Sequence, residues 1–300
     1  MLILLLAGLA LLQQTVSFSG ASRLQIALNN AAHVPWFFLV TSLIWQITAL
    51  FMQLRWRQQL FLVAALALIL AIGLEAVQFF TSRDADLSDV GLNLLGAGSA
   101  LLVILASNLR RKGHIKRAGL SIFLAIVLVS SSFTRAAEIM WVYSKRNALA
   151  PALITFDQAD FPLRSLLRGD WELVTAHNGA GEAMARQIAK VTLRSDRQWP
   201  GISLREPLPD WNQYRWLVLT AYTDSQRTLP LEIRLETNSD RGMDSTIKIV
   251  LHDSTSPIRI PLEQLAGSRY GKLNKVRNLI LFSTRLDRDE TFYLETISLE

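Results

Sequence analysis

Two hydrophobic patterns divide the chain near residue 150. In the first half, long apolar runs are separated by short polar segments. In the second half, apolar and polar residues alternate along short runs such as 231–235 and 292–299. A run of about 20 apolar residues is long enough to cross a bilayer as a helix, whereas alternation with period two is typical of half-buried strands. The sequence therefore predicts two architectures in one chain.

The apolar half predicts a helical transmembrane bundle of about five spans, over 1–18, 35–54, 60–80, 90–107 and 118–133. The breaks between the runs are too short to hold a folded domain, so consecutive helices are expected to pack as antiparallel hairpins. The first run resembles the apolar core of a signal peptide. It lacks a basic segment before it and an A-x-A cleavage site after it, which favours an uncleaved anchor but leaves cleavage open.

The second half predicts an all-β domain with strands over 153–156, 171–175, 188–193, 202–205, 216–222, 231–235, 246–251, 258–260, 276–282 and 292–299. Residues typical of turns separate these runs, and only 262–266 resembles a helical turn. Many short strands with regular breaks indicate a β-sandwich of the jelly-roll kind. The expected organisation is a transmembrane bundle over 1–110, a basic loop, fifth helix and linker over 111–150, and an extracytoplasmic sandwich over 151–300.

The distribution of charge predicts the orientation in the membrane. The 300-residue chain has a formal charge of +6, of which the first 150 residues carry +7 and the remainder −1. Arg55 and Arg57 lie in one loop, and a later loop on the same side carries Arg110, Arg111, Lys112, Lys116 and Arg117. Basic loops stay in the cytoplasm, so the amino terminus is expected inside and the sandwich outside the membrane. The basic excess thus reports orientation and argues against a nucleic-acid partner.

A polar cluster interrupts the apolar half between the third and fourth runs. Glu75 and Gln78 are i, i+3 neighbours on one helix face. Residues Asp86, Asp89 and Asn93 follow helical spacing on the next helix, with Arg83 on the turn. Ionisable groups inside a membrane are costly and are functional by default. The candidate ligand-binding residues are therefore Glu75, Gln78, Arg83, Asp86, Asp89 and Asn93.

The same residues also allow a purely structural interpretation. Asp86, Ser88 or Asp89 can cap the fourth helix, where negative charge suits the helix dipole, and Arg83 can neutralise a neighbouring carboxylate. Gly96 with Ala100 four residues later is typical of a face on which two helices approach closely. The residues alone leave both interpretations open.

A match of seven positions resembles the signature of the VanZ-like membrane family, Glu75-x-x-Gln78 and Arg83-x-x-Asp86-x-x-Asp89-x-x-x-Asn93-x-x-Gly96. That family is named after an accessory protein of glycopeptide-antibiotic resistance that protects against teicoplanin. His33 is similar to a His often seen before the second span, whereas Thr81-Ser82 replaces a Pro often found before the Arg. The resemblance covers roughly 1–110 and implies a polytopic envelope protein with an outer-leaflet site, without supplying a reaction.

In the second half, the segments 211–219, 258–262 and 292–299 resemble galactose-binding-like sandwiches, the fold of many carbohydrate-binding modules. This resemblance implies a fold and no particular ligand. Trp199 and Trp211, in loops that contain Pro, are the candidate platforms for stacking against sugar rings. Trp216 heads an apolar strand and is expected in the core.

Catalytic constellations are scarce in the sequence, so no catalytic residue, metal or cofactor is predicted. The chain has no Cys, its His residues lack metal-ligand spacing, and Asp287 and Asp289 are expected to be solvated turn residues. We expect an accessory envelope protein that recognises a lipid-linked cell-wall precursor or a polysaccharide without turnover. Two alternatives stay open: an enzyme using Glu75 or Asp86 as general acid/base with Mg²⁺ or Ca²⁺, and an anchor whose sandwich docks another protein.

Overall fold

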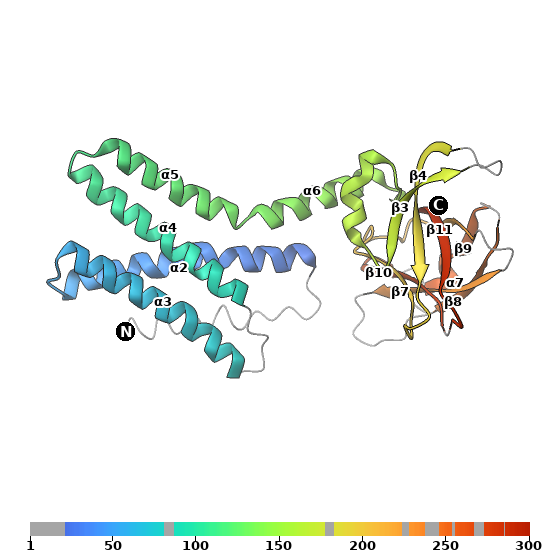
Figure 1. Cartoon of the computed structure of the whole chain (residues 1–300), viewed down its shortest axis with the longest axis horizontal. Helices are drawn as coiled ribbons and strands as arrows, with labels where there is room; N and C mark the ends of the chain where they lie inside the picture. Colours follow the sequence, from blue (N-terminus) through green and yellow to red (C-terminus); the bar gives the residue numbers. More distant parts are fainter. Residues whose placement is uncertain are drawn as a thin grey trace. The chain divides into compact units, whose positions relative to one another are not determined.

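The computed structural model of the chain describes residues 22–80, 87–177, 183–223, 228–237, 246–253, 256–266, 273–284 and 286–300. The chain divides into two compact units, Met1–Met140 and Trp141–Glu300. The first unit is helical and the second is built of two β-sheets (Figure 1).

The helices are α2 (Arg23–Phe51), α3 (Trp56–Phe80), α4 (Leu87–Arg111), α5 (Ile115–Ser131) and α6 (Thr134–Leu149). Over the described ranges, three helices are long and apolar enough to cross a membrane, and a fourth span results if the bent pair α5–α6 is counted as one. The prediction of five spans is therefore supported only in part. The first predicted run, 1–18, lies outside the described residues.

The fifth predicted span differs from the structure because α5 ends after 17 residues and α6 leaves it at 47°. The Ser131 and Ser132 hydroxyls at the break donate to the carbonyls of Leu128 and Val129. Such bonds from a side chain back to the preceding turn compete with the helical ladder and bend helices.

Helix α2 begins well before the predicted start at 35. Ser22 caps it: the Ser22 hydroxyl accepts from the Gln25 amide, and the Gln25 side chain accepts from the Ser22 amide. This capping box satisfies two amide donors at the helix start, so the helix forms despite Pro35 in its interior. His33 consequently lies inside the helix and not before it.

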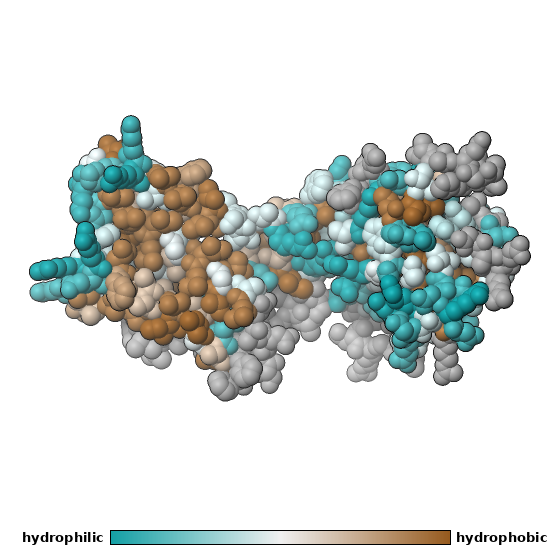
Figure 2. Space-filling model, in the orientation of Figure 1, coloured by the Kyte–Doolittle hydropathy of each residue, from teal (hydrophilic) through white to brown (hydrophobic). Residues whose placement is uncertain are grey.

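Helices α2 and α4 pack closely at Gly96, where an added Cβ would lie 2.2 Å from the carbonyl oxygen of Val34. The small-residue face predicted at Gly96 and Ala100 is thus confirmed, since both residues are buried. Large apolar side chains remain on the outside: Phe61 is 78% exposed and Phe123 is 60% exposed. Figure 2 shows apolar residues over most of the visible face of this unit, with hydrophilic side chains gathered at one end.

The second unit is a sandwich of two antiparallel sheets, which confirms the predicted architecture. One sheet has the strand order β3 (Trp171–His177), β4 (Ala183–Leu193), β11 (Glu290–Leu299), β6 (Trp216–Tyr222) and β9 (Ile258–Pro261), with β1 (Ala152–Ile154) also paired to β11. The other has the order β2 (Leu167–Arg168), β5 (Gly201–Arg205), β10 (Val276–Phe282), β7 (Leu229–Thr237) and β8 (Thr246–Leu251).

Alternation along the strands separates a buried face from an outer face. In β7, Leu231, Ile233 and Leu235 are buried while the residues between them are half-exposed. The ten predicted strands and the helical turn α7 (Leu262–Ala266) are confirmed. The short strand β2 and the 3-10 helix η1 (Gln158–Leu166) were not predicted, because neither shows a clear period in the sequence.

The end of α6 belongs to the second unit. The Tyr143 hydroxyl donates to the Glu206 carboxylate, and the Arg146 guanidinium donates to the Glu206 carbonyl oxygen at 3.0 Å. The guanidinium also lies 4.3 Å from the centre of the Tyr143 ring. These contacts join the end of the helix to the sandwich.

Candidate functional site

A buried polar pair links α2 to α4. The Nδ1 of His33 donates to the Oδ1 of Asn93 at 2.9 Å, and both side chains are buried. The Nε2 of the same His lies 3.8 Å from the Oδ2 of Asp89, one turn earlier in α4. The hydrogen bond on Nδ1 sets the orientation of the imidazole and leaves Nε2 on the side of Asp89. The structure therefore brings together two of the predicted site residues and adds His33 to them.

Glu75 lies at the same level of the bundle. Phe37, Ala71 and Ala97 pack together, one from each of the three helices. Since α3 runs opposite to α2 and α4, one turn towards the same end reaches Glu75 in α3, His33 in α2 and Asn93 in α4. Glu75 is only 7% exposed, so its carboxylate is inside the bundle.

The other three predicted residues of this site are not seen in contact with it, because their side chains lie outside the described part of the structure. Gln78 lies in the last turn of α3, and Arg83 and Asp86 lie outside the described residues. Among the residues that the structure describes, no three His, Cys, Asp or Glu side chains are grouped to hold a metal ion. A buried imidazole with carboxylates and an amide is suited to hydrogen bonding with a polar headgroup or to holding a proton.

The buried position of His33 can be recognised from a helical pattern in the sequence. This residue begins a stripe of buried residues at spacings of three and four along α2, His33, Phe37, Thr41, Ile44 and Thr48. The helical periodicity of these residues continues upstream of Pro35 and places His33 on the inner face of the helix.

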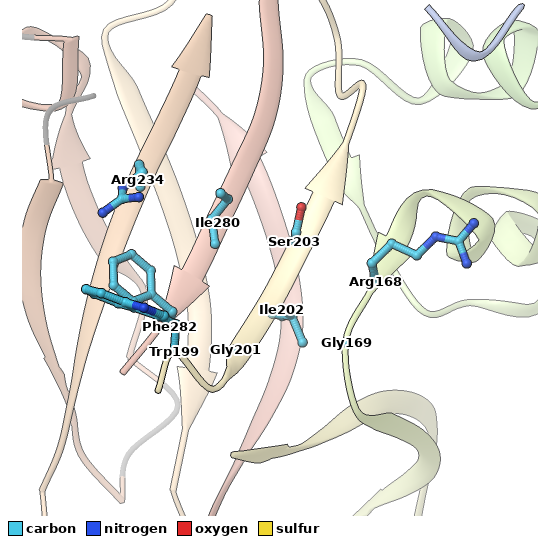
Figure 3. A pocket seen from close by; sticks show the side chains of 9 residues that line it. All are labelled: Arg168, Gly169, Trp199, Gly201, Ile202, Ser203, Arg234, Ile280 and Phe282. Atoms are coloured by element: carbon cyan, nitrogen blue, oxygen red, sulfur yellow. The ribbon is translucent and has the colours of Figure 1, made fainter. Parts of the chain in front are cut away.

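A second candidate site lies on the outer face of the sheet that contains β5, β10 and β7. A cavity of about 320 Å³ opens there, lined by Arg168, Gly169, Trp199, Gly201, Ile202, Ser203, Arg234, Ile280 and Phe282 (Figure 3). Ser203 and Arg234 each pair with Ile280 in the strand register, so the three form one row across the sheet. Side chains in such a row project to the same side of the sheet.

Trp199 forms an aromatic platform at this cavity. Its ring is packed edge-on against Phe282, with the centroids 5.7 Å apart and an interplanar angle of 63°, and it stays 55% exposed. The platform depends on Gly201, because an added Cβ there would lie 2.3 Å from the Leu281 carbonyl oxygen. An exposed ring fixed by an aromatic neighbour offers a flat apolar surface with little entropy to lose on binding.

For Trp211 and Trp216, the observed burial is the reverse of the predicted burial. Trp211, predicted as a surface platform, is 0% exposed, and its indole N–H donates to the Leu208 carbonyl oxygen. It belongs to the core and offers no ring face to a sugar. Trp216, predicted in the core, is 38% exposed at the start of β6. Both predictions were wrong: Trp216 is the first residue of β6, where the strand period does not yet decide burial, and Trp211 lies in the loop between β5 and β6, which shows no period.

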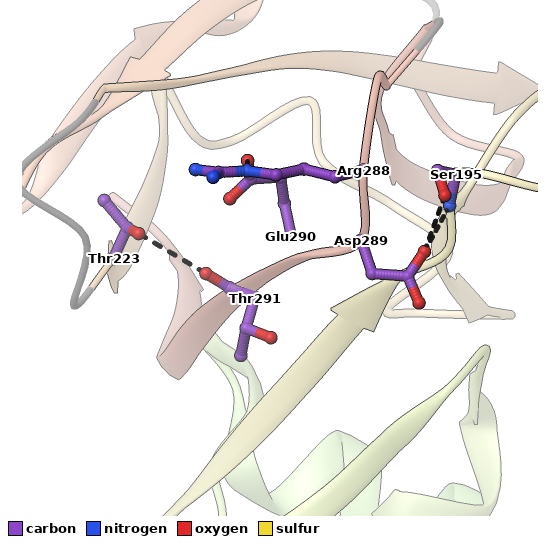
Figure 4. Close-up of polar contacts among 6 residues, drawn as sticks. All are labelled: Ser195, Thr223, Arg288, Asp289, Glu290 and Thr291. Carbon is purple, nitrogen blue, oxygen red and sulfur yellow. Dashed lines mark hydrogen bonds and ion pairs between the residues drawn. The ribbon is translucent and has the colours of Figure 1, made fainter.

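The acidic turn before β11 has a structural role. The Asp289 carboxylate accepts from the Ser195 amide and hydroxyl, each at 2.8 Å, and so joins the turn after β4 to β11 (Figure 4). These two hydrogen bonds lower the pKa of Asp289 below its ordinary value. The bond from the Ser195 amide is the larger cause and the bond from its hydroxyl is the second. Arg288 beside it donates to Glu290 at 2.8 Å. This turn contains side-chain bonds typical of a structural clamp.

Comparison with known proteins finds no matching family profile and no matching curated protein. Solved structures are similar to the sandwich. An exo-β-agarase is 13% identical with a TM-score of 0.38, over 45% of this chain and 23% of that one. A family 11 carbohydrate-binding module from Clostridium thermocellum, in complex with a β-1,3-1,4-mixed-linked tetrasaccharide, is 12% identical with a TM-score of 0.32, over 44% and 85%. A module specific for non-crystalline cellulose is 9% identical with a TM-score of 0.34, over 51% and 93%. These likenesses concern the fold alone.

Proposed function

We propose that the chain is a multi-pass protein of the bacterial cytoplasmic membrane whose sandwich binds a cell-envelope glycan outside the membrane, without catalysing its turnover. The observation that carries this proposal is the Trp199 platform over Phe282, exposed in a cavity that also holds Ser203 and Arg234. An aromatic ring for the apolar face of a sugar, with polar groups around it for the hydroxyls, is the combination that a glycan site needs.

Membrane insertion is supported by the surface of the helical unit. Apolar side chains as large as Phe61 and Phe123 lie exposed on helices long enough to span a bilayer. The basic connections α2–α3 and α4–α5 lie at one end of the bundle (Figure 1). With that end in the cytoplasm, α5–α6 leads to the outer side, where the sandwich would meet envelope glycans.

The helical unit is proposed to be VanZ-like. Its polar site of Glu75, Asp89 and Asn93, together with His33, lies towards the end of the bundle opposite the basic connections. That depth suits recognition of the headgroup of a lipid-linked cell-wall precursor, and tolerance of glycopeptide antibiotics would follow from such binding. A change in teicoplanin tolerance on deletion of the gene tests this part.

The glycan proposal is tested with the full chain purified in detergent micelles and applied to an array of cell-wall precursors and polysaccharides. We expect binding that Trp199→Ala weakens about tenfold or more, as for the loss of a buried aromatic contact. Trp216→Ala is the matched control, because it removes an equally large, partly exposed ring from the other sheet. Absence of binding to every probe, or an equal loss in both variants, contradicts the proposal.

The second candidate function is that of an enzyme. Its basis is the buried Glu75, which lies at the same level of the bundle as the His33–Asp89 pair. A buried carboxylate near an imidazole is the arrangement of a general acid/base. A Glu75→Gln variant that folds but changes neither envelope composition nor drug tolerance would argue against this role.

A further inference from the structure

Arg234 lies beside the aromatic platform and has no anionic partner among the residues that the structure describes. Its guanidinium carbon lies 5.1 Å from the centre of the Phe282 ring, an attractive cation–π distance. Its Nε is buried and has no hydrogen-bond acceptor among the residues that the structure describes. A buried donor without an acceptor costs free energy that an incoming acceptor would recover.

The two carboxylates that flank Arg234 on β7 each contact another side chain. Glu232 and Glu236 flank it on β7 and point to the same face. Glu232 lies 4.0 Å from the ammonium of Lys248 on β8, and Glu236 accepts from the amide of Asn278 on β10. Arg234 therefore keeps its positive charge available at the cavity.

A second guanidinium lies at the far end of the same row. Arg168 of β2 pairs with Ser203, which pairs with Ile280, which pairs with Arg234. Three strand spacings of about 4.8 Å make this row about 14 Å long. Figure 3 shows the Arg234 side chain beside the Trp199–Phe282 pair, whereas the exposed Arg168 side chain points away from it.

We propose that this site takes an acidic polysaccharide: one sugar ring stacks on Trp199 while a carboxylate or sulfate group on the chain pairs with Arg234. The planar guanidinium presents parallel N–H donors that match the two oxygens of such a group. The inference rests on the proposed function, since it names the class of glycan that the same cavity binds.

The experiment uses the full chain in detergent micelles and polymers that differ only in charge. One pair is polygalacturonate and its carboxyl-reduced galactan, and the other is a sulfated galactan and its desulfated form. We expect at least one acidic polymer to bind about tenfold more tightly than its neutral counterpart. Arg234→Gln removes that preference, and Arg234→Lys keeps part of it because the charge remains.

Arg259→Gln is the control, because it removes the same charge from the opposite sheet, where Arg259 pairs with Glu300 at 3.1 Å. We expect it to retain the preference for acidic polymers. Equal affinity for the charged and neutral members of both pairs overturns the inference but leaves the glycan proposal in place. The inference is also overturned if Arg234→Gln keeps the preference. Absence of binding to all four polymers overturns the inference, whereas the glycan proposal is decided by the array of cell-wall precursors and polysaccharides.

Discussion

The two units place polar and apolar residues in opposite ways. The helical unit buries His33, Asn93 and Glu75 and exposes Phe61, whereas the sandwich buries most of its described apolar residues and leaves the ring of Trp199 55% exposed beside Phe282. In each unit the candidate site departs from its surroundings: polar side chains are buried in the apolar bundle, and an aromatic ring is exposed on the sandwich. Polar groups inside an apolar bundle and an exposed aromatic ring on a polar sheet both cost stability, and such costs are typical of functional sites.

The largest expected effect is a difference in the free energy of unfolding between variants of the two loop tryptophans, Trp211 and Trp199. Trp211→Ala removes a fully buried ring and a hydrogen bond to Leu208, and should lower the free energy of unfolding of the sandwich by about 3–5 kcal/mol. Trp199→Ala should lower it by less than about 1 kcal/mol, since the ring is more than half exposed. Denaturant unfolding followed by near-ultraviolet circular dichroism measures both. A similar loss in the two variants would show that Trp199 is a core residue.

A smaller effect tests the close packing of the helical unit. Gly96→Ala places a methyl group against the Val34 carbonyl and should destabilise the bundle by about 1–3 kcal/mol. Gly98→Ala in the same helix is the matched control, because an added Cβ there meets nothing within 4 Å. Thermal unfolding in detergent should show a lower midpoint for the first variant only. Equal midpoints would contradict the observed contact of α2 with α4.

The polar pair inside the bundle should contribute less. A double-mutant cycle of His33→Phe and Asn93→Leu is expected to give a coupling energy of about 0.6–1.7 kcal/mol, the range for hydrogen bonds between membrane helices. A coupling energy of zero would indicate that the two side chains do not interact in the folded bundle.

The smallest effect concerns the turn at Asp289. Because its pKa is lowered in the folded state, the ionised carboxylate stabilises the sandwich above the unfolded pKa of about 3.9. That contribution is lost as the pH falls through the lower folded pKa. The unfolding midpoint of wild type should therefore exceed that of Asp289→Ala at pH 7 by a small margin that narrows towards pH 3. A margin that widens on acidification would contradict the hydrogen bonds to Ser195.

Much of the fold could be predicted from the sequence, because period in the hydrophobic pattern is a local property. The strands of the sandwich and the runs that became α3 and α4 follow from it. The start of α2 does not follow in the same way, since Pro35 marks a boundary in the hydrophobic pattern although Ser22 and Gln25 form the cap. The bend between α5 and α6 depends on serine hydroxyls whose bonds have no clear pattern in the sequence.

The sites were predicted in part. Helical spacing grouped Glu75, Asp89 and Asn93, but His33 is far from them in sequence and joins them only through the packing of α2 on α4. The exposure of Trp199 could be predicted from its loop, whereas Phe282 and Arg234 come from strands whose register decides that they meet. Register across a sheet depends on long-range pairing, which a single sequence does not display.

The most direct test of the account is hydrogen–deuterium exchange of the full chain with and without a bound acidic polysaccharide. We predict protection of residues 199–203, 230–236 and 278–282, with exchange in β3, β4 and the helices unchanged. Protection of the other sheet in place of these segments would contradict a glycan site on the Trp199 face.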